Sequence, residues 1–334
     1  MKLIKLNLLL VLVLGYFHFT CAQNVQDFKI KLLGAANLNY RKSPKKVVIS
    51  DFQLNFQTAL EMQDKKAGGK MWRGGLKGDA TASLALALEG LNEASLQEIT
   101  DQLFEQYKAE LNANGFEVVP IEGLWANNAY DKSRDKRWEL KAGKGAEKGN
   151  VFGDIVMRPS SQQFIVAKKS FNGKQKNNFT VLSDFETQVE SKIASQKNDF
   201  IFNKVVIYIQ AFENSMSEAE RSLNRMAGYA QVKAETDFRL SDMSFNKFGS
   251  GQMIAKDGVE VTNVLEKQKF DASQAADVDK LGTDVGVLRI WDVDDREEMT
   301  LGVVKCDPDK YATGTQLGVE AFLKATVQKL REKS

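Results

Sequence analysis

The sequence predicts an α+β protein with a mixed, largely antiparallel sheet and amphipathic helices packed on it. Three stretches of the 334 residues carry this prediction. Residues 95–113 repeat apolar side chains at three- and four-residue steps, as in a helix with one buried face. Residues 47–56 and 202–212 are rich in β-branched and aromatic side chains, which is typical of interior strands.

The first 22 residues have the pattern of a secretory signal peptide. Lys2 and Lys5 precede an apolar run, and small residues close the segment at Thr20 and Ala22. We expect cleavage after Ala22, so that residues 23–334 form a single α+β domain with a loosely ordered N-terminal arm. The predicted location is outside the cytoplasm: the periplasm, the outer membrane or the medium.

Cys21 raises the alternative of a lipoprotein. The three residues before it are bulkier than a lipobox usually allows, so we favour simple cleavage over lipidation at Cys21. No later stretch approaches the roughly 20 apolar residues of a membrane-spanning helix. After removal of the signal we therefore expect no transmembrane helix.

Removal of this segment limits the available chemistry. It takes away His18, the only histidine, and leaves Cys306 as the only cysteine. Imidazole-based nucleophile pairs, histidine metal ligands, intramolecular disulfides and thiolate metal clusters are then excluded. It also removes two of the 46 Lys+Arg residues, leaving 44 against 44 Asp+Glu, and a neutral chain has no basic field for nucleic acid. We expect no cofactor, no metal site and no nucleic-acid partner.

The first elements of the mature chain are expected to be strands joined by a hairpin. Residues 47–56 read as an interior strand, and residues 82–89 alternate leucine with small residues at a period of two. Between them, residues 67–78 contain five glycines but neither phosphate-loop spacing. We interpret this stretch as a flexible hairpin connection and Trp72 and Arg73 within it as a candidate contact loop.

A helix and a buried strand should follow. Ser95 and Glu98 have the spacing of a capping box at the start of the helix, and Asn114 with Gly115 provides a left-handed stop. The β-branched pair Val118 and Val119 then predicts the strand.

The second half repeats strand signals. A second capping box, Ser183 with Glu186, predicts a further helix, and alternation from Ala230 to Leu240 predicts a long strand with one wet face. Other strands are expected at residues 152–157, 163–167, 202–212, 252–254 and 259–264.

A last hairpin, residues 285–291 and 299–304, encloses an acidic turn. Its five carboxylates are the most metal-like cluster of the chain, but the EF-hand glycine is missing and Arg296 lies among them. We favour a solvated hairpin tip.

The chain should end in a helix. Asp307 and Pro308 mark its start as cap and first residue. Its apolar stripe comprises Val319, Phe322, Leu323, Val327 and Leu330. Cys306, just before it, is interpreted as a buried thiol at the end of a strand, because no histidine can activate it.

Three motifs resemble a known group of proteins. They are Asp51-Phe52 in the first strand, the segment Gly115–Val119 after the helix, and the segment Cys306–Tyr311 before the last helix. With the order of the elements, they resemble secreted bacterial proteins related loosely to the curli-transport (CsgG-like) envelope family. The resemblance implies an α+β domain in the bacterial envelope, a non-enzymatic role in secretion or envelope assembly, and a tendency to form homo-oligomers.

Three functions are compatible with these observations. The first is an exported, non-catalytic envelope protein that binds or scaffolds a protein or another envelope component. The second is a small-molecule or lipid carrier in which Trp72, Trp125 and Trp138 line a cavity. The third and least favoured is a hydrolase that uses two carboxylates alone, at a separation that sequence does not reveal.

Overall fold

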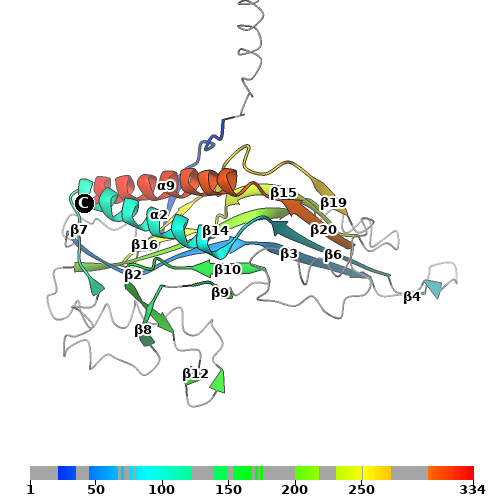
Figure 1. Ribbon diagram of the computed structural model, residues 1–334, viewed down its shortest axis with the longest axis horizontal. Helices are drawn as coiled ribbons and strands as arrows, with labels where there is room; N and C mark the ends of the chain where they lie inside the picture. The colour runs from blue at the N-terminus through cyan, green and yellow to red at the C-terminus, as the bar shows by residue number, and fades with distance from the viewer. Residues whose placement is uncertain are drawn as a thin grey trace, which may run out of the picture.

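The computed structural model describes most of the chain after the N-terminal segment (Figure 1). The described residues are 22–34, 45–66, 69–70, 76–77, 80–121, 138–143, 145–148, 153–167, 170–171, 174–175, 200–217, 231–249, 251–271 and 300–334. They form a mixed α+β structure dominated by strands, with two long helices, α2 (Glu93–Ala113) and α9 (Pro308–Lys333).

The main sheet is built around two long neighbouring strands, β2 (Lys46–Gln57) and β14 (Phe200–Asn214), which pair in parallel. Both are rich in Val, Ile and Phe, and β2 is buried on both faces over most of its length. Outward from β14 lie β16, β17 and the edge strand β1, and outward from β2 lie β10 and β9. Their bounds are β16 (Phe245–Phe248), β17 (Gly251–Ala255), β1 (Ile30–Gly34), β10 (Asp154–Met157) and β9 (Glu147–Lys148).

Several short strands complete this sheet. β15 (Lys233–Leu240) pairs with β14 and carries β18 (Val259–Glu260) and β19 (Lys269–Asp271), while β7 (Glu117–Val118) pairs with β2. Along β15 buried and half-buried residues alternate strictly, so the predicted strand with one wetter face is confirmed.

A second sheet continues from the end of β2. It contains β3 (Ala59–Lys66), its antiparallel partner β6 (Ala80–Glu89), and β20 (Thr300–Lys305), which pairs with β6 in parallel. A hairpin is therefore present around the glycine-rich stretch, but it joins β6 to β3, a strand that was not predicted, and the expected strand at residues 47–56 lies in the main sheet. The hairpin is extended by the pairing of β4 (Gly69–Lys70) with β5 (Leu76–Lys77). Two further two-stranded pairs are β8 (Trp138–Ala142) with β11 (Gln163–Ala167), and β12 (Ser170–Phe171) with β13 (Lys174–Gln175).

Thr58 marks the corner where the chain leaves the main sheet and enters the second one. Its amide and its hydroxyl both donate to the carbonyl of Gly153, each at 2.7 Å, and its own carbonyl accepts from the amide of Leu88 at 2.8 Å. Gly153 has φ +81°, and an added Cβ would lie 2.1 Å from the carbonyl oxygen of Ala59. Only glycine fits at this close approach.

The two helices lie side by side and contact each other (Figure 1). α2 (Glu93–Ala113) and α9 (Pro308–Lys333) each bury a stripe of side chains. The predicted cap Asp307 accepts hydrogen bonds from the amides of Asp309 and Lys310, and all five predicted stripe residues of α9 are buried. Gly314 and Gly318 allow close packing, because a Cβ at Gly314 would lie 2.4 Å from Val264.

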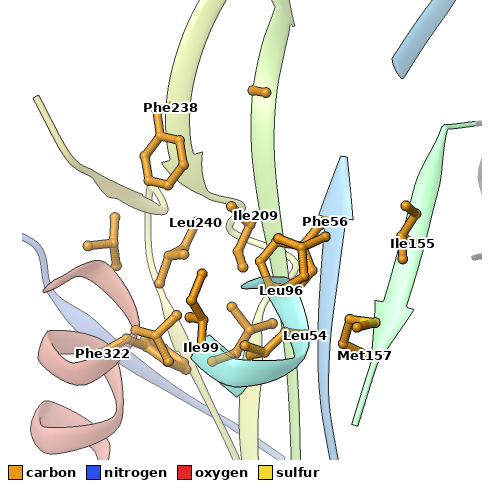
Figure 2. Close-up of a cluster of buried hydrophobic side chains, with 14 of the residues drawn as sticks. Leu54, Phe56, Leu96, Ile99, Ile155, Met157, Ile209, Phe238, Leu240 and Phe322 are labelled. Carbon is orange, nitrogen blue, oxygen red and sulfur yellow. The ribbon is translucent and has the colours of Figure 1, made fainter. Parts of the chain in front are cut away.

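The hydrophobic core joins side chains of both sheets and both helices. Figure 2 shows Leu54, Ile155 and Ile209 from neighbouring strands converging with Leu96 of α2 and Phe322 of α9, all fully buried. The ring centroids of Phe52 and Phe104 are 5.2 Å apart in an edge-to-face arrangement, and Phe104 makes a similar contact with Phe164 at 5.8 Å.

A buried polar network crosses this core. The Tyr107 hydroxyl donates to Asn203 Oδ1 at 3.1 Å, and Asn203 Nδ2 donates to Asn246 Oδ1 at 2.7 Å. Asn246 Nδ2 in turn donates to the Tyr107 hydroxyl at 3.1 Å and to Thr326 Oγ1 at 2.9 Å. Burial raises the pKa of Tyr107, although its bonds to the two asparagines act in the opposite direction. The network links α2, β14, β16 and α9.

The helix start and the following strand differ from expectation. The cap of α2 is Asn92, whose Oδ1 accepts from the amide of Ser95 at 2.9 Å, so the predicted capping box at Ser95 and Glu98 is wrong. Asn92 supplies the same type of acceptor three residues earlier, and the helix gains a turn. The stop at Asn114 and Gly115 is confirmed, with Gly115 at φ +84°.

β7 is only two residues long, with Glu117 exposed and Val118 half-buried, so the expected buried strand is a short edge element. It pairs with β2 only at Lys46 and Val47, so that few of its side chains can be covered by neighbouring residues.

The start of the expected N-terminal arm is hydrogen-bonded to the domain. β1 pairs with β17 from Ile30 to Gly34, and the side-chain amide of Gln23 donates to the carbonyl of Lys310 at 2.8 Å. Ile30 and Leu32 are partly buried and pack against the core, a pattern too short to recognise in the sequence. Residues 35–44, the helix predicted at Ser183, and the hairpin partner at 285–291 lie outside the described residues.

Substitution of Tyr107 by Phe should destabilise the fold, because two buried asparagine amides lose a partner. We expect a loss of about 1–3 kcal/mol in the free energy of unfolding, measured by urea denaturation. The control is Tyr208→Phe, since no described residue bonds to that hydroxyl, and it should change stability by under about 0.5 kcal/mol. Equal losses in the two variants would contradict the role of the network.

Substitution of Gly153 by Ala tests the corner at Thr58. Gly115→Ala is the matched control, because both glycines have positive φ but nothing lies within 4 Å of a Cβ at Gly115. We expect the control to cost about 1–2 kcal/mol from backbone strain, and Gly153→Ala to cost clearly more from the added clash. Thermal unfolding that ranks the two variants in the opposite order would disprove this assignment.

Candidate functional site

The contact loop predicted from the sequence cannot be placed. Trp72 and Arg73 lie outside the described residues, although the strands on either side, β4 and β5, pair with each other. Cys21, Trp125 and the acidic turn at 292–298 also lie outside them. The described part of Trp138 is its backbone in β8.

A second surface is formed by the strand residues that point away from the core. Because side chains alternate along a strand, the neighbours of Phe52, Leu54 and Phe56 on β2 lie on the face opposite these buried side chains. The register extends this face across β10, β14, β16 and β17. We call it the polar face. Its described members include Asp51, Gln53, Asn55, Asp154, Arg158, Lys204, Tyr208, Lys247 and Gln252.

One half of the polar face is a network of ion pairs around Arg158. Its Nε lies 2.8 Å from Asp51 Oδ1, one Nη donates to Gln53 Oε1 at 2.8 Å, and the other lies 3.4 Å from Glu147 Oε2. Lys204 Nζ lies 4.0 Å from the second oxygen of Asp51. Arg158 and Asp51 are only 13% and 7% exposed, so these charges neutralise each other in a largely buried setting.

Burial alone would lower the pKa of Arg158. The charge and hydrogen bond of Asp51, together with the charge of Glu147, outweigh it, and the pKa of Arg158 is raised. The guanidinium of Arg158 therefore forms ion pairs within the chain, with Asp51 and Glu147. The pair with Asp51 connects the end of β10 to β2 and has a structural role.

The other half of the polar face has a different character. Asp154 follows the Gly153 corner and is 9% exposed, and no described residue donates a hydrogen bond to its carboxylate or forms an ion pair with it. Burial raises the pKa of Asp154 to about 6. On β14, burial and then the charge of Asp154 raise the pKa of Tyr208, while Lys204 acts in the opposite direction.

Cys306 is buried at the end of β20, as the sequence predicts. Burial, with a smaller effect of Asp307, raises the pKa of its thiol to about 12. Near neutral pH it is protonated, which leaves it a poor nucleophile. In the described part of the chain no three His, Cys, Asp or Glu side chains are grouped so that they could hold a metal ion. Neither of the two helices described has the length and apolarity needed to cross a bilayer.

Sequence reasoning missed Asp154 and Arg158. The strand at 152–157 was predicted, and its period-two pattern places Asp154 opposite the apolar Ile155 and Met157. The pairing of Arg158 with Asp51 joins residues 107 positions apart and leaves no local signal. With this geometry established, comparison with known proteins gave no match among family models, curated proteins or solved structures.

Asp154→Asn should stabilise the protein in a pH-dependent manner. Burial raises the pKa of Asp154 in the folded state above the usual Asp value. Below about pH 4 the carboxyl is protonated in both the folded and the unfolded wild type, and its burial carries no charge penalty. The wild type loses folding stability as pH rises through about 6, because the buried carboxyl must then ionise. We expect the two proteins to be equally stable near pH 4, and the variant to be more stable by up to about 2 kcal/mol above pH 7. Thermal unfolding from pH 4 to 8 checks this; a constant difference, or a less stable variant at pH 8, would contradict it.

Proposed function

We propose that this protein is an exported, non-catalytic component of the bacterial envelope that binds a protein partner through its polar face. The proposal keeps the first hypothesis from the sequence, including export after loss of the N-terminal segment and a role in secretion or envelope assembly. It extends the finer architecture expected from the sequence, in which α2 and α9 are amphipathic helices that cover one side of the sheet. The opposite side is then available for recognition.

The observation that carries the proposal is the composition of the polar face. Lys204 on β14 is directly opposite Lys247 on β16, which in turn pairs with Gln252 on β17. Charged and amide side chains of this kind, half-buried and held on a rigid sheet, can form hydrogen bonds and ion pairs with a partner of complementary charge. Such groups can make binding specific without catalysing a reaction.

The arrangement of Arg158 favours binding over catalysis. Three of its five N–H donors bond to Asp51, Gln53 and Glu147, and the two carboxylates neutralise its charge, so it is poorly placed to stabilise charge on a substrate. The carrier hypothesis depended on Trp72, Trp125 and Trp138, and no described side chain supports it.

The test compares two double variants with the same change of charge. Lys247→Glu with Gln252→Glu alters the polar face, whereas Lys324→Glu with Gln328→Glu alters exposed positions on α9. Each full-length protein is expressed in its own host, followed by fractionation, in-cell crosslinking and quantitative mass spectrometry. We expect export of all three proteins, and a crosslinked partner shared by the wild type and the α9 variant whose yield falls at least fivefold in the polar-face variant.

Two outcomes would contradict the proposal. Retention of the wild-type protein in the cytoplasm would exclude the envelope role. Equal recovery of the same partner with both double variants would show that the polar face is not the binding surface. Circular dichroism of each variant confirms that it is folded before crosslinks are compared.

A further inference from the structure

Three neighbouring side chains on the polar face offer acceptors that no described residue of the chain uses. We call Asn55, Asp154 and Tyr208 the acceptor cluster. Tyr208 pairs with Asn55 in the parallel ladder, and Asp154 lies diagonally from Asn55 across the β10–β2 pair, so all three belong to the same face.

The orientation of Asn55 is fixed by the fold. Its Nδ2 donates to the carbonyl of Ile207 at 3.1 Å, which leaves its Oδ1 as a free acceptor among the described residues. Asn55 is 6% exposed and Asp154 is 9% exposed. Within the described chain no donor reaches the carboxylate of Asp154 or the hydroxyl of Tyr208.

Buried carboxylates are normally paired, because an isolated charge in a low-dielectric setting is costly. On the same face, the cations Arg158 and Lys204 lie beside Asp51 instead. Among the described residues, the polar face thus has one half in which Arg158 pairs with carboxylates and another half in which acceptors have no hydrogen-bond donor. No described cation forms an ion pair with Asp154 in the acceptor cluster.

We propose that the acceptor cluster binds a primary ammonium group. An ammonium carries three N–H donors, which match the carboxylate of Asp154, the amide oxygen of Asn55 and the hydroxyl oxygen of Tyr208. The Tyr208 ring can add a cation–π contact. A hard metal cation fits less well, because calcium takes six to eight oxygen ligands and usually more than one carboxylate. This site is independent of the envelope role proposed above.

Binding should depend on the protonation of Asp154. Burial and then the charge of Asp154 raise the pKa of Tyr208 on β14, while Lys204 acts in the opposite direction. Burial, Cys306 and Asp154 raise the pKa of Tyr311 on α9. Both tyrosines therefore stay protonated between pH 5 and 8. With the pKa of Asp154 at about 6, the ionised fraction rises about tenfold between pH 5 and pH 8, and affinity should rise by the same factor.

The experiment is calorimetric titration of the full chain with propylammonium chloride at constant ionic strength, at pH 5 and pH 8. Tetramethylammonium has the same charge but no N–H donor, and should not bind. Asp154→Asn should weaken binding at least tenfold, and Tyr208→Phe about threefold. Asp237→Asn is the matched control: it removes a carboxylate from β15 while Arg239 stays paired with Glu213, and it should bind as the wild type does.

A second arm separates a free amine from a lysine side chain. A short lysine peptide is titrated in parallel with the same peptide acetylated on its ε-amine. Binding of the unmodified peptide supports recognition of a lysine, and binding of propylammonium alone supports a small amine as the source.

The proposal fails if propylammonium does not bind the wild type, or if tetramethylammonium or the acetylated peptide binds equally well. It also fails if Asp154→Asn binds like the wild type. Should Asp154→Asn not fold, the pH dependence of the wild type and the Tyr208→Phe comparison still decide, and the absence of both effects overturns the proposal.

Discussion

Four buried polar side chains, which hydrogen-bond to one another in the core, connect two helices to two strands. Tyr107 comes from α2, Asn203 from β14, Asn246 from β16 and Thr326 from α9. Their donors and acceptors can form these hydrogen bonds only when the four elements have one particular arrangement relative to each other. Apolar packing alone tolerates small sliding motions, but a buried donor or acceptor that loses its partner costs about 1–3 kcal/mol. The network therefore selects one register among several that the apolar stripes of the helices would accept.

This constraint has a consequence for the other side of the sheet. With the apolar side chains of β2 and β10 turned into the core, residues such as Asp51 and Asp154 are directed to the opposite face of the sheet, where charge replaces apolar contact. One half of that face is internally neutralised by Arg158. In the other half Asp154 is left with a raised pKa, a cost to folding that a ligand or partner would offset.

Much of the fold follows from local patterns in the sequence. The lengths of β2, β14, β15 and α9 agree with the apolar periodicity, because each pattern is long and is reinforced by packing. The start of α2 was misplaced because Asn92 and Ser95 are both good caps, and tertiary contacts decide between them. The docking of β1 was missed because an edge strand of five residues has too few alternations to be recognised.

The candidate site could not be predicted from the sequence, because its residues are far apart along the chain. Asp51 and Arg158, or Asn55 and Tyr208, become neighbours only through pairing between distant strands, including the parallel pair of β2 and β14. No periodicity within one element specifies such a partner. A polar residue at an otherwise buried strand position, such as Asp154, is the one signal that could have marked the face in advance.

Native-state hydrogen exchange reports whether the buried network holds the two helices and the strands together as one unit. If the buried network locks both helices to the sheet, the amides around Tyr107 in α2, Thr326 in α9 and Asn203 in β14 should exchange only through one shared unfolding event. Their opening free energies would then be equal and would match the global stability from denaturation. Exchange of the α9 amides through a separate opening of clearly lower free energy would contradict this account.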